Sequence, residues 1–248
     1  MITNAHQIDY TIHGHDLQYV EIELDPQEAT VAEAGAMLYM EQYIRMDTIF
    51  GDGSAQSSGF LGSLLGAGKR LLAGEGLFMT VFSNQGQTKQ KVAFSAPYPG
   101  KIMALDLATL GGKILCQKDS FICAAKGVAV GIGFQKRIMT GLFGGEGFIL
   151  QKLEGDGLAF IHAGGTLFEK QLADGEQLRV DTGCLVAFQP SIDFSIKTVS
   201  GIKNAFLGGE GFFFAQLTGP GKVWLQSLPF SRVVGQILQR LPPSRNNR

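Results

Sequence analysis

Three glutamates recur in one seven-residue phrase, and carboxylates that converge in this way could bind a metal ion. Glu75, Glu146 and Glu210 each stand between two glycines, with large apolar residues on both sides. If a symmetric fold brings them together, their oxygens could hold calcium or magnesium. Calcium takes roughly six to eight oxygens, more than three lone glutamates supply, so solvated turn glutamates are the favoured interpretation. The three residues stay as candidate ligand-binding residues.

The glycine that follows each glutamate predicts a tight turn. Gly76, Gly147 and Gly211 are expected to adopt positive φ, which costs glycine nothing and strains every β-branched residue. Replacing any one of them by valine is therefore expected to destabilise the protein by more than about 1 kcal/mol.

A second group with metal-ligand chemistry is His13-Gly14-His15, with Glu21 downstream. A transition-metal site needs about three or four convergent ligands, and the distant His162 lies in another part of the chain. Because Gly14 predicts a turn here, two solvated turn histidines are favoured, and we expect no metal.

Catalytic patterns are missing from the rest of the sequence. No Ser, Cys or Lys can be paired with a base, and the glycine-rich strings lack the spacing of phosphate-binding loops. Cys116, Cys123 and Cys184 form no CxxC pair and are expected to be reduced core thiols. The sequence therefore predicts a protein that is not an enzyme and has no cofactor.

Composition excludes some further classes. The 248 residues carry a net charge of −1, and only 17% are charged, so nucleic-acid binding is disfavoured. The first ten residues have no basic start and no apolar run follows, which indicates a cytoplasmic protein without a signal peptide. No stretch approaches the roughly 20 apolar residues of a membrane-spanning helix.

The elements that would position these residues are short strands. Apolar and polar residues alternate between turn residues from Tyr10 to Met40, residues 163–188 repeat the arrangement, and Gly111 to Ala124 is a looser copy. Apolar runs follow each Gly-Glu-Gly, and the phrase at Pro99–Ile102 matches the one at Pro220–Val223. We predict an all-β domain, residues 1–229, in three repeats of about 1–105, 106–162 and 163–229. Three such units suggest a β-prism or barrel with pseudo-threefold symmetry.

Two segments have helical spacing instead. Residues 60–72 place leucines opposite Lys69 and Arg70, and residues 230–241 place apolar residues at i, i+3, i+4 and i+7 before Pro242-Pro243. We predict two short amphipathic helices, the second leading into a tail that ends at residue 248. Amphipathic helices usually bury their apolar stripe on their own protein, so packing on the β-core is favoured over a neighbouring subunit or a membrane.

The three Gly-Glu-Gly phrases, the opening Gly14–Gln18 followed by Val31–Met37, and the glycine-rich apolar segment before Glu75 resemble one family. It is the mitochondrial-biogenesis family named for altered inheritance of mitochondria, found widely in bacteria as proteins of unknown function. The resemblance implies a fold similar to the tryptophan-RNA-binding attenuation protein, a short variant of the double-stranded β-helix. It implies no established activity.

Three functions stay open. The favoured one is a non-enzymatic oligomeric β-scaffold or binding protein, which presents surfaces or a shallow pocket to a protein or lipid partner and most simply forms a homo-oligomer. The alternatives are a small-molecule or metal-binding protein of cupin type, which the repeated glutamates suggest, and a peripheral membrane protein anchored through residues 59–72.

Overall fold

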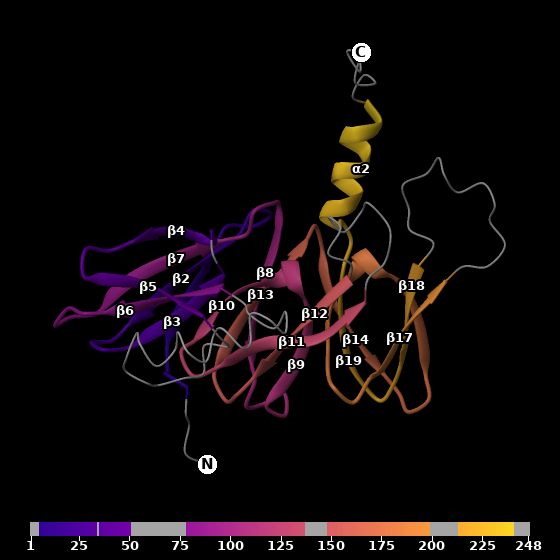
Figure 1. The fold of residues 1–248 in the computed structure, drawn as a ribbon, viewed down its shortest axis with the longest axis horizontal. Coiled ribbons are helices and arrows are strands. Elements are labelled where there is room, and N and C mark those ends of the chain that lie inside the picture. Colours follow the sequence, from indigo (N-terminus) through magenta and orange to yellow (C-terminus); the bar gives the residue numbers. More distant parts are fainter. Residues whose placement is uncertain (1–4, 34, 51–77, 137–147, 199–212, 241–248) are drawn as a thin grey trace.

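The computed structural model describes residues 5–33, 35–50, 78–136, 148–198 and 213–240, and in them the chain is mostly antiparallel β-structure (Figure 1). Nineteen strands form four sheets, and one α-helix lies at the C-terminal end of this part of the chain. The predicted all-β class is confirmed. The predicted helix at residues 60–72 falls outside the described residues.

The first two sheets hold the N-terminal half of the chain. The first has the order β1 (Asp9–His13), β2 (Tyr19–Leu24), β7 (Gln90–Ser95) and β4 (Met37–Met40). The second has the order β5 (Ile44–Phe50), β6 (Phe78–Asn84), β3 (Ala29–Glu33), β10 (Phe121–Ala125), β13 (Leu158–Gly164) and β8 (Gly100–Asp106).

The other two sheets hold most of the C-terminal half. The third has the order β11 (Ala129–Lys136), β12 (Phe148–Glu154), β9 (Lys113–Gln117), β16 (Leu185–Phe188), β19 (Gly221–Gln226) and β14 (Leu167–Leu172). The fourth has the order β15 (Gln177–Asp181), β18 (Phe213–Thr218) and β17 (Asp193–Thr198). Two short 3-10 turns, η1 (Lys118–Ser120) and η3 (Thr182–Cys184), and helix α2 (Phe230–Arg240) complete the elements.

The same pairing order recurs in three stretches of chain, residues 19–95, 100–164 and 167–226. In each stretch the first, sixth and third strands form one three-stranded half, and the fourth, fifth and second strands form another. Each six-stranded sheet joins a half of one stretch to a half of the next, through β3 with β10 and through β9 with β16. A threefold axis, the β-prism or double-stranded β-helix, the likeness to the attenuation protein and the predicted domain limits stay predictions.

The local sequence and the position in the sheet explain which strands expose one face to solvent. In β2 the alternate residues Val20, Ile22 and Leu24 are fully buried and the residues between them are partly exposed, as in an antiparallel sheet with one face on the core. Strand β10 has five buried residues in a row because it lies in the middle of a six-stranded sheet. The strands predicted between Tyr10 and Met40 are confirmed as β1 to β4, but of these only β2 alternates buried and exposed residues along its whole length.

One predicted equivalence of turns is wrong. The Pro99 phrase precedes β8, the first strand of the second stretch, whereas the Pro220 phrase precedes β19, the last strand of the third. The turn at Asp156 does correspond to that at Pro220, since it precedes β13, which pairs with β8 as β19 pairs with β14. Two similar turn phrases arise at different places because both need a glycine at the start of a strand.

Two clusters of buried side chains form the core. The larger gathers residues of the first two stretches together with Val186, Ala187 and Trp224, and the smaller gathers around Phe148 of the second stretch and Phe188 and Leu217 of the third. The ring of Phe194 stacks against both phenylalanines of the smaller cluster, with ring centroids 5.8 and 5.2 Å apart.

The predicted C-terminal helix is confirmed over Phe230–Arg240, and it projects from the β-body (Figure 1). Phe230 stacks on Tyr98 with ring centroids 5.1 Å apart, and the Arg232 guanidinium pairs with Asp181 at 3.3 Å. Phe230 is nevertheless 50% exposed and Ile237 is 55% exposed. The expectation that the helix buries its apolar stripe on its own β-core is wrong for these two residues. Within the described residues no helix has the length and apolar character needed to cross a membrane.

Candidate functional site

The three repeated phrases lie outside the described residues. This holds for Glu75, Glu146 and Glu210 and for the turn glycines Gly76, Gly147 and Gly211. Convergence of the three carboxylates and positive φ at the three glycines therefore stay predictions.

The histidine pair lies at a turn, as predicted. His13 ends β1 and its ring stacks on Tyr19 with centroids 4.8 Å apart, and its Nε2 lies 3.9 Å from a Glu21 oxygen. Gly14 has a φ of +87°, and a Cβ there would come within 2.4 Å of the Leu17 carbonyl oxygen. The His15 carbonyl accepts a hydrogen bond from Lys101. Over the described residues, no three His, Cys, Asp or Glu side chains come together as metal ligands.

The cysteines lie in or near the core. Cys116 and Cys123 are fully buried thiols without a disulfide, and burial raises the pKa of both well above the ordinary value. Cys184 is half-buried beside α2. Because the thiolate is the reactive form, the two buried cysteines are inert as nucleophiles near neutral pH.

Two titratable groups with shifted pKa values were missed from the sequence, the buried His162 and the partly buried Glu33. Burial lowers the pKa of His162 to about 4, and this ring meets Tyr98 edge-on with centroids 4.6 Å apart. Burial, and then the charge of Asp119, raises the pKa of Glu33 to about 7. The hydrophobicity pattern around these two residues does not indicate that either side chain is removed from solvent. Their burial depends on strands from distant parts of the chain.

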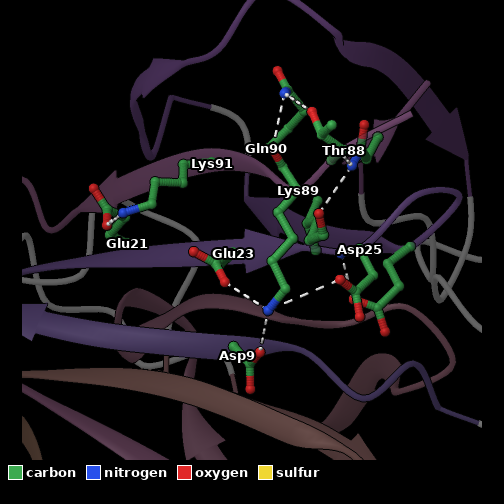
Figure 2. Close-up of polar contacts among 11 residues, drawn as sticks. Asp9, Glu21, Glu23, Asp25, Thr88, Lys89, Gln90 and Lys91 are labelled. Atoms are coloured by element: carbon green, nitrogen blue, oxygen red, sulfur yellow. Dashed lines mark hydrogen bonds and ion pairs between the residues drawn. The ribbon is translucent and has the colours of Figure 1, made fainter. Parts of the chain in front are cut away.

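A ladder of ion pairs covers the exposed face of the first sheet (Figure 2). The Lys89 ammonium lies 2.7 Å from Glu23, 3.1 Å from Asp9 and 3.9 Å from Asp25. Lys91 pairs with Glu21 at 2.7 Å, and Glu21 also accepts a hydrogen bond from the Tyr39 hydroxyl.

The second half of this ladder reaches the edge of the sheet. The hydrogen bonds from Lys91 and Tyr39 lower the pKa of Glu21, and the bond to Glu21 raises the pKa of Tyr39 to about 12. Exposed ion pairs contribute little to stability. Here the contacts of Glu21 fix position instead, because they link Tyr39 of the edge strand β4 to Glu21 of β2 and Lys91 of β7.

Strand β4 is the most unusual surface of the described chain. All four of its residues are large and apolar and all are exposed: Met37 by 39%, Leu38 by 50%, Tyr39 by 38% and Met40 by 40%. The nearby Tyr43 and Met46 are more than half exposed as well. Half of the exposed large apolar side chains in the described residues thus lie between Met37 and Met46. Contiguous apolar surface of this kind marks interaction sites.

The strands that correspond to β4 in the other two stretches are buried. β10 and β16 pair with β13 and β19 as β4 pairs with β7, and each of the three pairings has a register shift after its first residue pair. Every residue of β10 and β16 is buried, because the opposite edge of each is covered by β3 or β9. Strand β4 has the same apolar character without that covering strand.

Strand β15 occupies in the third stretch the place that β3 and β9 occupy in the first two. Those strands pair with β10 and β16, whereas β15 has no such partner in the part of the chain that the structure describes. It pairs only with β18 among the described strands, and Gln177, Arg179 and Asp181 are exposed along it. The Arg179 guanidinium lies 5.5 Å from the centre of the Phe214 ring, and Asp181 accepts a hydrogen bond from the backbone of Gly183. Both charges are thus held on their own sheet.

A shallow depression adjoins the exposed strand. Leu38 of β4 lines it together with Leu17, Tyr19 and Tyr98, and its volume is about 350 Å³. The arrangement as a whole offers apolar contact area and unpaired strand edges. It brings together no nucleophile and base among the described residues.

Known proteins resemble the chain over nearly its full length. A family model described as mitochondrial biogenesis AIM24 matches residues 10–228. An uncharacterized protein of Streptococcus pyogenes serotype M6 is 30% identical over 230 residues, which cover 92% of this chain and 88% of the relative. The crystal structure of another Streptococcus pyogenes protein superposes with a TM-score of 0.73 at 21% identity, covering 95% of this chain and 100% of that one. This structure supports the fold alone. The extent of the family match shows that the chain belongs to the mitochondrial biogenesis AIM24 family.

Proposed function

We propose that the protein is a non-enzymatic β-scaffold that acts as a homo-oligomer. The observation that carries this proposal is the exposed apolar strand β4, whose counterparts β10 and β16 are buried in sheets. Soluble proteins usually protect an exposed strand edge with charges or proline, and β4 has neither. A surface of this composition is stable in water when another protein surface covers it.

The chemistry of the described residues supports a scaffold over an enzyme. The two fully buried cysteines are held as thiols, and His162 is enclosed and neutral near pH 7. The ion pairs of the first sheet are mutually satisfied and face solvent. These groups stabilise or position strands.

Native mass spectrometry of the untagged protein, with metal analysis of the same sample, tests this function. A mass equal to a whole number of bare chains above one, without metal, is the expected result. A monomer at all concentrations would overturn the proposal. One metal per chain would favour the cupin-like alternative, with Glu75→Gln, Glu146→Gln and Glu210→Gln as the next variants.

A second function has one observation in its favour. Helix α2 carries the exposed apolar residues Phe230 and Ile237 together with the basic residues Arg232 and Arg240, a composition that suits attachment to an anionic membrane surface. Sedimentation with anionic liposomes at low salt tests it. Ile237→Glu should abolish binding, and binding that survives this change would exclude the helix as the anchor.

A further inference from the structure

The chain contains two joins of one kind between its stretches. In the first, β3 pairs antiparallel with β10, with Ala32 opposite Cys123. In the second, β9 pairs antiparallel with β16, with Cys116 opposite Ala187. In both, the second strand of one stretch covers the third strand of the next. The joins are therefore repeated uses of one interface within a single chain.

A third join of this kind would need β15 and β4, and each pairs with a single neighbour among the described strands. β4 is the third strand of the first stretch and β15 is the second strand of the last. The sheet that holds β4 and the sheet that holds β17, β18 and β15 lie at opposite ends of the molecule (Figure 1). The two edges therefore do not meet within one chain.

We infer that copies of this protein assemble head to tail, with β4 of one protomer pairing antiparallel with β15 of the next. The inference rests on the proposed scaffold function and names the surfaces that build the oligomer. Such a contact is heterologous, because two different edges meet, and it generates a ring if the rotation closes and a filament if it does not.

The internal joins also predict the register of the contact between protomers, that is, which residues of β4 and β15 lie opposite one another. Tyr39 corresponds to Cys123 and Ala187, since each is the first residue after the register shift in its strand. On the other side, Ala32, Cys116 and Val180 pair with the residues that stand fourth after each Gly-Glu-Gly phrase, Thr80, Gln151 and Ala215. Tyr39 of one protomer therefore lies opposite Val180 of the next, and Met40 lies opposite Arg179.

The side chains at the two edges fit this pairing. β4 offers apolar residues and no charge, so it carries nothing that opposes addition of a strand. Val180 is buried on its own sheet and continues the core side of the join, as Ala32 and Cys116 do. The depression beside Leu38 adds apolar surface next to the same edge.

Cross-linking between two variants tests the register. Chains with Tyr39→Cys and chains with Val180→Cys, both also carrying Cys184→Ser because Cys184 is a half-buried thiol near β15, are mixed, and a short thiol-specific cross-linker is added. The expected result is a covalent pair of the two different chains, with no pair formed by either variant alone. Phe168→Cys, a comparably exposed apolar position on β14, serves as the control and should not link to Val180→Cys. Self-linking of Tyr39→Cys would show β4 pairing with itself and would overturn the inference.

A charge exchange tests the same contact without cross-linking. Met40→Lys places a second cation opposite Arg179 and should raise the dissociation constant of the oligomer at least about tenfold. The double variant Met40→Lys/Arg179→Glu should restore assembly, which a merely misfolded edge would not do. Absence of rescue, with the single variant dissociated, would overturn the register.

The two proposals fail in different ways. A wild-type protein that stays monomeric removes the scaffold function and the join together. An oligomer that forms without the Tyr39 and Val180 link, and without an effect of Met40→Lys, keeps the scaffold function and removes only the β4–β15 contact.

Discussion

At the scale of single residues, burial determines the chemistry more than residue type does. His162, Glu33 and Cys116 belong to residue types that serve as acids, bases and nucleophiles, yet distant strands enclose each of them. Burial disfavours the charged form, and it shifts the three pKa values in the direction that keeps each group neutral. The pH dependence of stability should report these shifts.

The neutral form of His162 should make the protein sensitive to acid. Its pKa falls from 6.5 in the unfolded chain to about 4 in the fold, so its contribution is complete above pH 6.5 and is lost as the pH falls toward 4. Between pH 8 and pH 5 this amounts to about 2 kcal/mol. His162→Phe, which keeps the ring contact with Tyr98, should lose less stability over that interval in urea unfolding. An unchanged pH slope would show that His162 titrates normally.

Glu33 should act in the opposite direction. Its pKa rises from 4.5 in the unfolded chain to about 7 in the fold, so its contribution is complete below pH 4.5 and is lost as the pH rises through 7. Glu33→Gln should therefore be more stable than the wild type at pH 8, by up to about 3 kcal/mol, and nearly equal to it at pH 4. Thermal unfolding at the two pH values measures this. A variant that is less stable at pH 8 would mean that the charged carboxylate has a stabilising partner.

At the scale of elements, local patterns predict which segments are strands and turns. The alternation in β2 and the apolar spacing of α2 appear in the structure where the sequence predicts them. The turn phrases are less informative, since those at Pro99 and Pro220 begin strands that occupy different places in the sheets. Turn chemistry reports local backbone conformation and not the pairing that follows.

Two glycines with positive φ separate backbone strain from steric clash. Gly14 and Gly35 have φ values of +87° and +89°, but a Cβ would approach the Leu17 carbonyl to 2.4 Å at Gly14 and meet nothing within 4 Å at Gly35. Gly35→Ala should cost about 1 kcal/mol from strain alone, and Gly14→Ala should cost more. Gly131→Ala, at an ordinary φ with open space, is the control. Equal costs at Gly14 and Gly35 in chemical denaturation would show that the turn relieves the clash.

At the scale of the whole molecule, the described sheets end in two edge strands that the internal joins leave over. Two half-sheets of one stretch are each completed by the next stretch, whereas β4 and β15 pair with one neighbour each among the described strands. The fraction of molecules in which the apolar β4 edge is covered then depends on the concentration of partner molecules.

Thermal stability should therefore depend on protein concentration. A hundredfold increase in concentration should raise the melting temperature of the wild type, because association stabilises the folded state by mass action. Met40→Lys should show a smaller rise over the same range, because its association is weaker. A wild-type melting temperature that stays constant would mean that the two edges remain open over this range, and it would contradict assembly.

Periodicity and turn chemistry, which act over a few residues, predict the all-β class, the strands from Tyr10 to Met40, the turn at Gly14 and the C-terminal helix. The family is indicated instead by the resemblance of the repeated motifs. The exposure of Met37–Met40, in contrast to the burial of the similar strands Phe121–Ala125 and Leu185–Phe188, appears only in the folded structure. The reason is that burial of a strand depends on its partners, and each partner comes from a different stretch of the chain. The same cause hid His162 and Glu33, whose surroundings are built by residues far away in sequence.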